Sequence, residues 1–389
     1  MKVSMGKLTM ELIINNMKSQ YKVANKAEKS ELLDQACQTL SMHRKSVIRL
    51  FNRTTEAKRK RPGRKKQYDS PELIKVLKDI WLISDQICGQ RLKMILPEWL
   101  PFYEKHHGNL SKEIKDQLQS VSSATINRLL KPYRLHPKFC TTKPGSLLKV
   151  HIPIKTNQWD ESMPGFVEAD TVAHCGDSLS GDFMWSLTVS DIATCWTENR
   201  AIWNKGAHGV IEAIKSIQAA LPFKLRGFDS DNGSEFLNRY LIRYFASESI
   251  QMTRSSPYHK NDNAHVEQKN WTHVRQLLGY HRYDNIKLVA LVNDLYQNEV
   301  SLFNNHFMPN FKLISKHREG SRIIKKHDKP QTPYQRVMAS KHIDRSMKIK
   351  LAVVHKQLDP FELQQIIQEK LSVINKLVNL DRKQKRKAI

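Results

Sequence analysis

The sequence predicts a multidomain protein in which helical N-terminal units precede a mixed α/β domain and a basic C-terminal region. Its length of 389 residues suits two to four domains. The net charge of +26 is uneven, with +17 in residues 1–150, −3 in residues 151–285 and +12 in residues 286–389. Apolar residues follow helical spacing before residue 135 and form β-rich runs after residue 160. The net charge and the spacing of the apolar residues therefore change in the same part of the sequence.

The two basic arms indicate a polyanionic partner, and nucleic acid is the usual one. A generally basic protein with solvated faces would spread its excess charge evenly. The hydrophobic fraction of 40% excludes wholesale disorder. We expect a soluble protein with no membrane partner, because no window approaches the ~18 apolar residues of a span and the N-terminus lacks a secretory signal. Five cysteines without a CxxC pair argue against a disulfide framework and a zinc module.

Residues 1–57 are predicted to bind DNA through a helix-turn-helix at 27–53. Ser30 is expected to cap the first helix, and a break at residues 41 and 42 separates it from a helix over 43–53. The second helix has an apolar back and a basic front, as a recognition helix in the major groove requires. Its predicted DNA contacts are Arg44, Lys45 and Arg49. An ordinary helical hairpin would give the same pattern.

Residues 58–69 are predicted to form a basic linker. Its Pro-Gly pair forbids helix, so the segment can lie along phosphates or enter a minor groove. The alternative is a merely solvated linker. The predicted DNA contacts here are Lys58, Arg59, Lys60, Arg61, Arg64, Lys65 and Lys66.

Residues 70–135 are predicted to form a second helical DNA-binding unit. Leu73, Leu77, Ile80 and Trp81 mark one helix at apolar spacing. The run 121–130 begins with capping serines and has the character of another recognition helix, with Arg128 as its DNA contact. Residues 136–160 contain three prolines and a glycine, which predict a linker.

Residues 161–285 are predicted to form the α/β domain. Short turns between three β-rich runs, at 165–174, 182–191 and 194–203, predict an antiparallel meander. The pattern then predicts a helix, a strand, a helix, a strand and a helix at 209–220, 223–228, 235–247, 250–253 and 262–280. The result is a mixed five-stranded sheet with helices.

Two aspartates of this domain occur at unusual places. Asp170 lies within the first predicted strand, where aspartate is disfavoured. Asp231 begins an Asp-Asn-Gly run after the fourth strand, which by itself reads as a tight turn. Asp229 is a nearby rival to Asp231. The position of Asp170 is therefore the stronger indication of chemistry.

Glu267 lies one turn into the last predicted helix, on a stripe formed by Ala264, Trp271, Val274 and Leu278. A carboxylate on a buried stripe costs several kcal/mol unless it is paired or metal-bound. The alternative is a first-turn glutamate favoured by the helix dipole. Taken together, three carboxylates near strand and helix ends can hold two Mg²⁺ ions ~3.5–4 Å apart, a pair that supports phosphodiester chemistry.

These residues resemble those of the DDE transposases and retroviral-type integrases of the ribonuclease H-like superfamily, and in particular insertion-sequence transposases. In that family a strand Asp, an Asp in a DNG turn and a helical Glu 35 residues further on form the metal site. Asp231 and Glu267 are separated by 35 residues here. Residues 256–267 resemble the family's catalytic loop, and residues 332–336 resemble a transposase tail more weakly. The strong resemblance covers residues 160–285.

The resemblance implies a ribonuclease H-like fold and metal-dependent DNA strand cleavage and strand transfer. Asp170, Asp231 and Glu267 would be catalytic and would bind Mg²⁺ or Mn²⁺, as two ions. The partners would be the element's terminal inverted repeats, target DNA and further copies of the chain, in the bacterial cytoplasm at the nucleoid. Lys260 and Lys269 would contact DNA phosphates, although plain surface charge explains each of them equally well.

Two rival functions are a metal-dependent nuclease of the same fold and a DNA-binding regulator with an inactive core. The intact carboxylates speak against the second. Residues 286–389 are predicted to be a basic region that ends in an amphipathic helix at 361–380. That helix is expected either to pack within the domain or to form an oligomer contact.

Overall fold

The computed structural model describes residues 7–52, 67–134, 163–230, 236, 239–254 and 264–387. The chain divides into two compact units, Met1–Gln67 and Tyr68–Ile389. The basic linker at 58–66 lies outside the described residues. Within the described residues, no helix is both long and apolar enough to cross a membrane.

The described part of the first unit consists of three helices, α1 (Lys7–Val23), α2 (Lys26–Leu40) and α3 (Arg44–Asn52). Leu33, Ala36, Val47 and Phe51 form its buried core. The break between α2 and α3 falls where the sequence predicts it, and Ser41 takes a left-handed conformation there with φ 51°. The predicted cap at Ser30 is wrong: Asn25 caps α2, because its side chain and that of Glu28 form a reciprocal capping box.

The second unit contains the predicted five-stranded mixed sheet, in the order β3-β2-β1-β4-β5. Strands β1, β2 and β3 are antiparallel neighbours, whereas β4 runs parallel to β1 and β5 parallel to β4. The bounds are β1 Phe166–Ala173, β2 Met184–Asp191, β3 Thr197–Trp203, β4 Gly227–Ser230 and β5 Gln251–Arg254. The fourth strand begins later than predicted, because its pairing starts where Gly227 meets Phe166, the first residue of β1.

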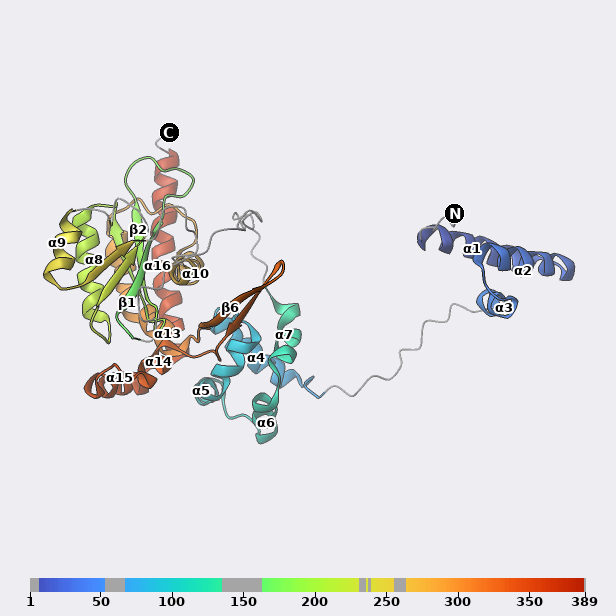
Figure 1. Ribbon diagram of the computed structural model, residues 1–389, viewed down its shortest axis with the longest axis horizontal. Coiled ribbons are helices and arrows are strands. Elements are labelled where there is room, and N and C mark those ends of the chain that lie inside the picture. Colours follow the sequence, from blue (N-terminus) through green and yellow to red (C-terminus); the bar gives the residue numbers. More distant parts are fainter. Residues whose placement is uncertain are drawn as a thin grey trace. The chain divides into compact units, whose positions relative to one another are not determined.

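Helices cover both faces of this sheet (Figure 1). Helices α8 (Ala207–Ala220) and α9 (Arg239–Ser247) pack against one face around buried Val167, Ala169 and Phe228. The other face meets the last predicted helix of the domain, which consists of α10 (Ala264–Lys269), a π-helical segment Asn270–Arg275 and α11 (Gln276–Leu278). Helix α12 (Lys287–Leu295) and α13 (Ser301–Phe307), joined by a π-helical segment Tyr296–Val300, pack beside β3.

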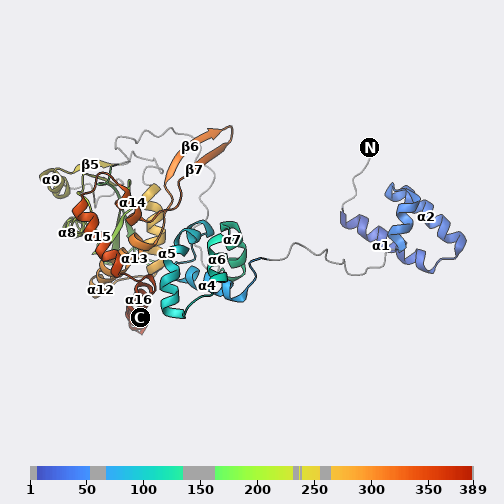
Figure 2. The ribbon, with the colours of Figure 1, turned by 90° about the horizontal axis from the view of Figure 1, so that it is seen from below.

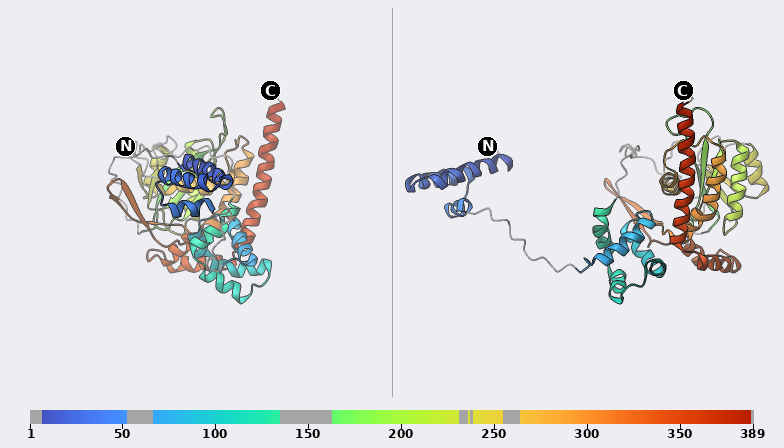
Figure 3. Two further views of the ribbon diagram at one scale, coloured as in Figure 1. Left: turned by 90° about the vertical axis from the view of Figure 1, so that its right-hand side faces the viewer. Right: turned by 180° about the vertical axis from the view of Figure 1, so that it is seen from behind.

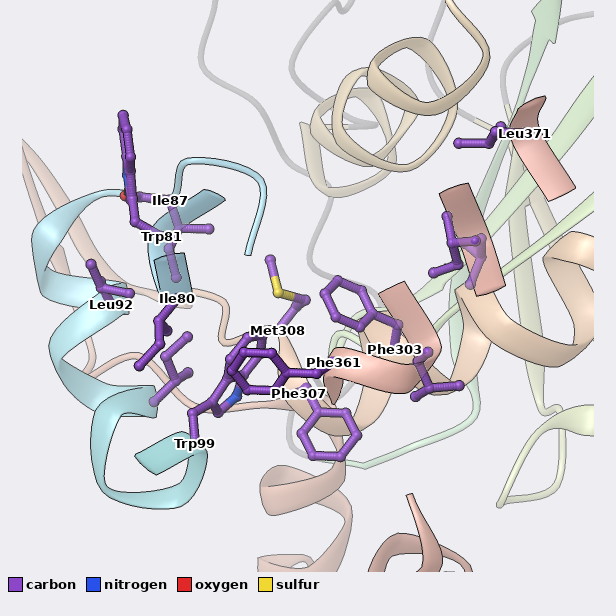
Figure 4. Close-up of a cluster of buried hydrophobic side chains, with 14 of the residues drawn as sticks. Ile80, Trp81, Ile87, Leu92, Trp99, Phe303, Phe307, Met308, Phe361 and Leu371 are labelled. Atoms are coloured by element: carbon purple, nitrogen blue, oxygen red, sulfur yellow. Dashed lines mark hydrogen bonds between the residues drawn. The ribbon is translucent and has the colours of Figure 1, made fainter. Parts of the chain in front are cut away.

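The helices of residues 71–130 share a hydrophobic core with helices of the C-terminal region. They are α4 (Pro71–Ile83), α5 (Gly89–His107), α6 (Lys112–Ser120) and α7 (Ser123–Leu130), with a 3₁₀ turn at Lys131–Tyr133. Figure 4 shows Trp99 of α5 among Phe303, Phe307 and Phe361, and its ring lies 5.7 Å from that of Phe361. The segment predicted as a separate DNA-binding unit therefore packs into the second compact unit.

The C-terminal region ends in the long helix α16 (Pro360–Lys387), which stands along the unit in Figure 3. It follows α14 (Pro333–Ala339) and α15 (Arg345–Gln357). The predicted apolar stripe of α16 is buried in the shared core and consists of Leu363, Ile367, Leu371, Ile374 and Val378. Of the two expectations for this helix, the structure supports packing within the unit.

A two-stranded ribbon interrupts the helices of this region. Strands β6 (Leu313–Glu319) and β7 (Arg322–His327) pair antiparallel and are joined by a turn at Gly320 and Ser321. Gly320 has φ +58°, which suits a tight hairpin turn. Figure 2 shows the ribbon projecting from the second unit. These two strands were not predicted from the sequence.

Candidate active site

Asp170 lies on the face of β1 that meets α10. Side chains alternate along a strand, so Val167 and Ala169 enter the core under α8 and α9, while Glu168 and Asp170 point to the opposite face. The backbone N–H of Thr171 donates to Oδ1 of Asp170 at 2.7 Å. Nδ2 of Asn270 donates to Oδ2 of Asp170 at 2.6 Å. This half-buried carboxylate is thus held in one orientation from two sides.

The turn of helix that contains Glu267 is attached to β1 on both sides of that residue. The backbone N–H of Val266 donates to Oε2 of buried Glu168 at 3.2 Å. One turn further on, Asn270 bonds to Asp170. The backbone of Glu267 lies in α10 between these two contacts, whereas its side chain is outside what the structure describes.

The pairing of β4 with β1 relates the position of Asp170 in the chain to that of Asp231. Ser230, the last residue of β4, pairs with Ala169, which directly precedes Asp170. Asp231 directly follows Ser230 in the sequence and lies outside the described residues. The rival Asp229 pairs in register with Glu168, and its Oδ1 accepts a hydrogen bond from the Thr253 hydroxyl at 2.6 Å. The carboxylate of Asp229 is thus already hydrogen-bonded to a residue of β5.

The predicted DNA contacts have different surroundings. On α3, Lys45 and Arg49 are exposed, while Arg44 is paired with Asp34 and donates to the Ser30 hydroxyl at 2.8 Å. Arg128 is exposed on α7, and its guanidinium donates to the Thr125 hydroxyl at 3.1 Å. Lys260 lies outside the described residues, as do the predicted contacts of the basic linker.

Lys269 does not fit the predicted contact with DNA phosphates, because it is only 5% exposed. Its Nζ donates to Oδ1 of Asn310 at 3.0 Å. From Asn270 the helix is π-helical, and its wider turn changes which of the following residues face inward: His273 is buried while Trp271 is 39% exposed. The predicted stripe assumed 3.6 residues per turn throughout and therefore placed Trp271 inward wrongly.

Burial lowers the pKa of Lys269 from 10.5 to about 8. Because the folded-state value lies below the unfolded one, burying the ammonium is unfavourable below about pH 8, and this penalty disappears as the pH rises to 10.5. We expect the free energy of unfolding to gain on the order of 3 kcal/mol over that interval from this residue. Urea denaturation at several pH values measures the gain.

Two substitutions isolate this contribution. Lys269→Met should remove the gain between pH 8 and 10.5, since the apolar side chain has no proton to lose. Lys224→Met, at an exposed lysine, should retain it. An identical pH profile for Lys269→Met and the unsubstituted protein would show that Lys269 is not buried as a cation.

Sequence reasoning missed two polar residues of this site, Glu168 and Asn270. Glu168 is only 4% exposed although it is a carboxylate in a strand. Its spacing of two from Asp170 was a usable signal, because i and i+2 share a face of a strand. Asn270 follows Glu267 by three positions, which places it on the same side of a helix.

The site offers oxygen ligands of the kind that Mg²⁺ prefers. Besides the carboxylate of Asp170, Oδ1 of Asn270 is buried and has no hydrogen-bond partner within the described part of the chain. An unpaired carbonyl oxygen beside a carboxylate is costly to bury unless a cation or water engages it. These donors therefore fit a hard divalent cation.

The chain was compared with protein families and with curated proteins. No protein-family model matches it. It is 37% identical over 324 residues to "Uncharacterized protein y4rM" of Sinorhizobium fredii (strain NBRC 101917 / NGR234), a match that covers 81% of this chain and 91% of that protein. The chain therefore belongs to the same family as that protein, whose name states no activity.

The solved structures that match the chain include retroviral integrases. The HTLV-2 integrase catalytic core in complex with magnesium is 16% identical, with a TM-score of 0.29, over 39% of this chain and 93% of that one. The BIV integrase catalytic core is 17% identical, with a TM-score of 0.29, over 46% and 96%. A simian T-cell lymphotropic virus intasome bound to the PP2A regulatory subunit B56 gamma is 14% identical, with a TM-score of 0.32, over 63% and 75%.

Proposed function

We propose that this protein is a DDE transposase of ribonuclease H-like fold, which cleaves DNA strands and transfers them to target DNA in a metal-dependent reaction. The observation that carries the proposal is the attachment of the Glu267 turn to β1. Hydrogen bonds to Glu168 and Asp170 flank Glu267 in the chain. The β1–β4 register ends one residue before Asp170 and one before Asp231. This register and these hydrogen bonds support a site in which Asp170, Asp231 and Glu267 act together.

Asp170, Asp231 and Glu267 would hold Mg²⁺ or Mn²⁺ in a site for two ions, because carboxylates supply the hard oxygen ligands that these cations take. When bound, such ions activate a nucleophile and stabilise a leaving oxygen at a phosphodiester. The protein's part is to orient the ligands. Asn270 and the Thr171 N–H fix the Asp170 carboxylate, so that its oxygens need not reorganise during the reaction.

The proposed partners are the terminal inverted repeats of a mobile element, target DNA and further copies of the chain. The exposed cations Lys45, Arg49 and Arg128 are proposed to contact DNA. Arg44, Lys260 and the basic residues at 58–66 stay predicted contacts. A transferase must hold two DNA segments at once, and the basic residues before and after the core supply charge for both.

The test separates a transposase from a nuclease of the same fold. A pre-cleaved terminal duplex with a free 3′-hydroxyl should be joined covalently to plasmid DNA in Mg²⁺ or Mn²⁺. A dideoxy 3′ end should abolish the joining, because the hydroxyl is the nucleophile. If the protein only shortens its substrates and the dideoxy end makes no difference, the nuclease function holds instead.

A further inference from the structure

The ribbon β6–β7 is a strongly basic element, and all of its side chains that the structure describes are exposed. Its strands contain five Lys and Arg residues, at 316, 318, 322, 325 and 326, and one acidic residue, Glu319. Ile314 is 60% exposed and Ile324 39% exposed. An isolated two-stranded hairpin is only marginally stable in water, so a binding partner would stabilise the ribbon.

The pairing within the ribbon concentrates positive charge. Lys316 lies directly opposite Lys325 in the antiparallel register. Like charges at opposed positions destabilise a strand pair. Lys325 and Lys326 are both exposed, and no ion pair is found for either of them among the described residues. A polyanion would remove this repulsion, which makes the ribbon complementary to phosphates.

The ribbon has a fixed root. The backbone N–H of Lys312 donates to Oδ1 of Asp328 at 2.7 Å, and Arg336 of α14 bonds to Asp328 at 2.7 Å. Arg336 also donates to the backbone oxygen of Asn310 at 3.0 Å. Asn310 in turn accepts from Lys269, the last residue of α10. Buried Lys269 thereby links the ribbon's root to the helix that carries Glu267.

A groove of about 670 Å³ lies at this root. Helix α5 and the start of α7 form one side of it, and the chain after β7 forms the other. Its lining includes Lys93, Met94, Ser123, His327, Asp328 and Lys329. The predicted recognition helix α7 and the ribbon thus border one hollow.

We propose that the ribbon β6–β7 inserts into the major groove of double-stranded DNA and fixes the duplex relative to the catalytic helix. The major groove, about 12 Å wide, admits a two-stranded β-ribbon. Strands of six and seven residues extend for about 20 Å, long enough to follow the groove. The inference rests on the proposed function for the identity of the polymer as DNA.

The test is duplex binding by the full chain in EDTA, measured by fluorescence anisotropy over a range of salt concentrations. Lys325→Glu with Lys326→Glu should weaken binding to a random-sequence duplex by at least about tenfold and lower the salt slope by about two. The reversal at 325 puts a carboxylate opposite Lys316, which favours the strand pair. Ribbon unfolding therefore cannot explain the loss.

The matched control is Lys224→Glu with Arg226→Glu. Both residues are exposed and precede β4, at the end of the sheet away from Asp170. Affinity should stay within about twofold of the unsubstituted chain, because the same charge change is made outside the ribbon. Equal losses in the two double variants, or no loss in either, would overturn the proposal.

Binding to other nucleic acids tests whether the ribbon enters the major groove. Double-stranded RNA has a deep, narrow major groove that protein elements cannot enter, and single strands have no groove. The ribbon substitutions should therefore change binding to either by less than about twofold. A loss as large as that on duplex DNA would overturn groove insertion. Because no joining is measured, a protein that fails the strand-transfer test can still pass this one.

Discussion

Asp170→Asn should abolish strand joining, with a loss of at least about a thousandfold. Removing one ligand of a two-ion site costs several kcal/mol of transition-state stabilisation, and each tenfold corresponds to about 1.4 kcal/mol. The amide is nearly isosteric, and Thr171 and Asn270 remain next to it. The fold and the affinity for DNA should therefore be unchanged. A gel-based joining assay and anisotropy measure the two properties.

Asp229→Asn is the matched control for this loss. Asp229 lies across the strand pair from Glu168 and accepts from Thr253, so its neutralisation should leave most of the activity. The same assay applied to Asp231→Asn and Glu267→Gln should give losses like that of Asp170→Asn. If any of the three variants still cleaves DNA, that residue does not belong to the site. If Asp229→Asn is inactive, Asp229 and not Asp231 is the second acidic residue of the site.

Asn270→Asp should lower joining by about a hundredfold at neutral pH. The substitution places a second carboxylate where an amide now lies 2.6 Å from Oδ2 of Asp170. Two such carboxylates repel each other, and one of them takes up a proton or turns away. Raising the Mn²⁺ concentration should recover part of the rate, because a cation offsets the repulsion. Joining rates across a metal titration measure both effects.

Asn270→Ala and Gln268→Ala complete this series. The alanine at 270 removes the hydrogen bond without adding charge, so we expect a loss of about tenfold and little recovery with metal. Gln268 is exposed on the same helix, and its substitution should have no effect. If Asn270→Asp joins DNA at the unsubstituted rate, Asn270 does not orient Asp170 during the reaction.

The order of strands and helices in the α/β domain could be predicted from the sequence, because each element has a periodic apolar face. The β-rich runs around residues 170, 187 and 200 and the helix at 209–220 all have counterparts in the structure. The assignment of Asp170, Asp231 and Glu267 came from their spacing and stays a prediction. Their neighbours Glu168 and Asn270 were signalled only by their spacing from Asp170 and Glu267, and the hydrogen bonds that join β1 to the last helix could not be predicted from that spacing.

Other features depend on local geometry that the sequence pattern does not reveal. The π-helical segment after Lys269 shifts the buried face by part of a turn, so the exposure of Trp271 escaped a regular helical projection. The ribbon β6–β7 had a weak signal, since Gly-Ser separates two short runs that contain Ile314, Ile323 and Ile324. The dense positive charge of this segment obscured that signal.

The core shared by α5 and α16 has a consequence for synthesis of the protein. Trp99 can pack against Phe361 only after more than two hundred further residues have been translated. Translation proceeds at roughly 5–20 residues per second, so the side chains around Trp99 that pack against α16 stay uncovered on the ribosome for tens of seconds. The unit Met1–Gln67 contains its own core and has no such delay. A nascent chain can therefore acquire a folded N-terminal unit well before the unit with the acidic residues is complete, and a chain truncated before α16 should be a target for chaperones and proteases.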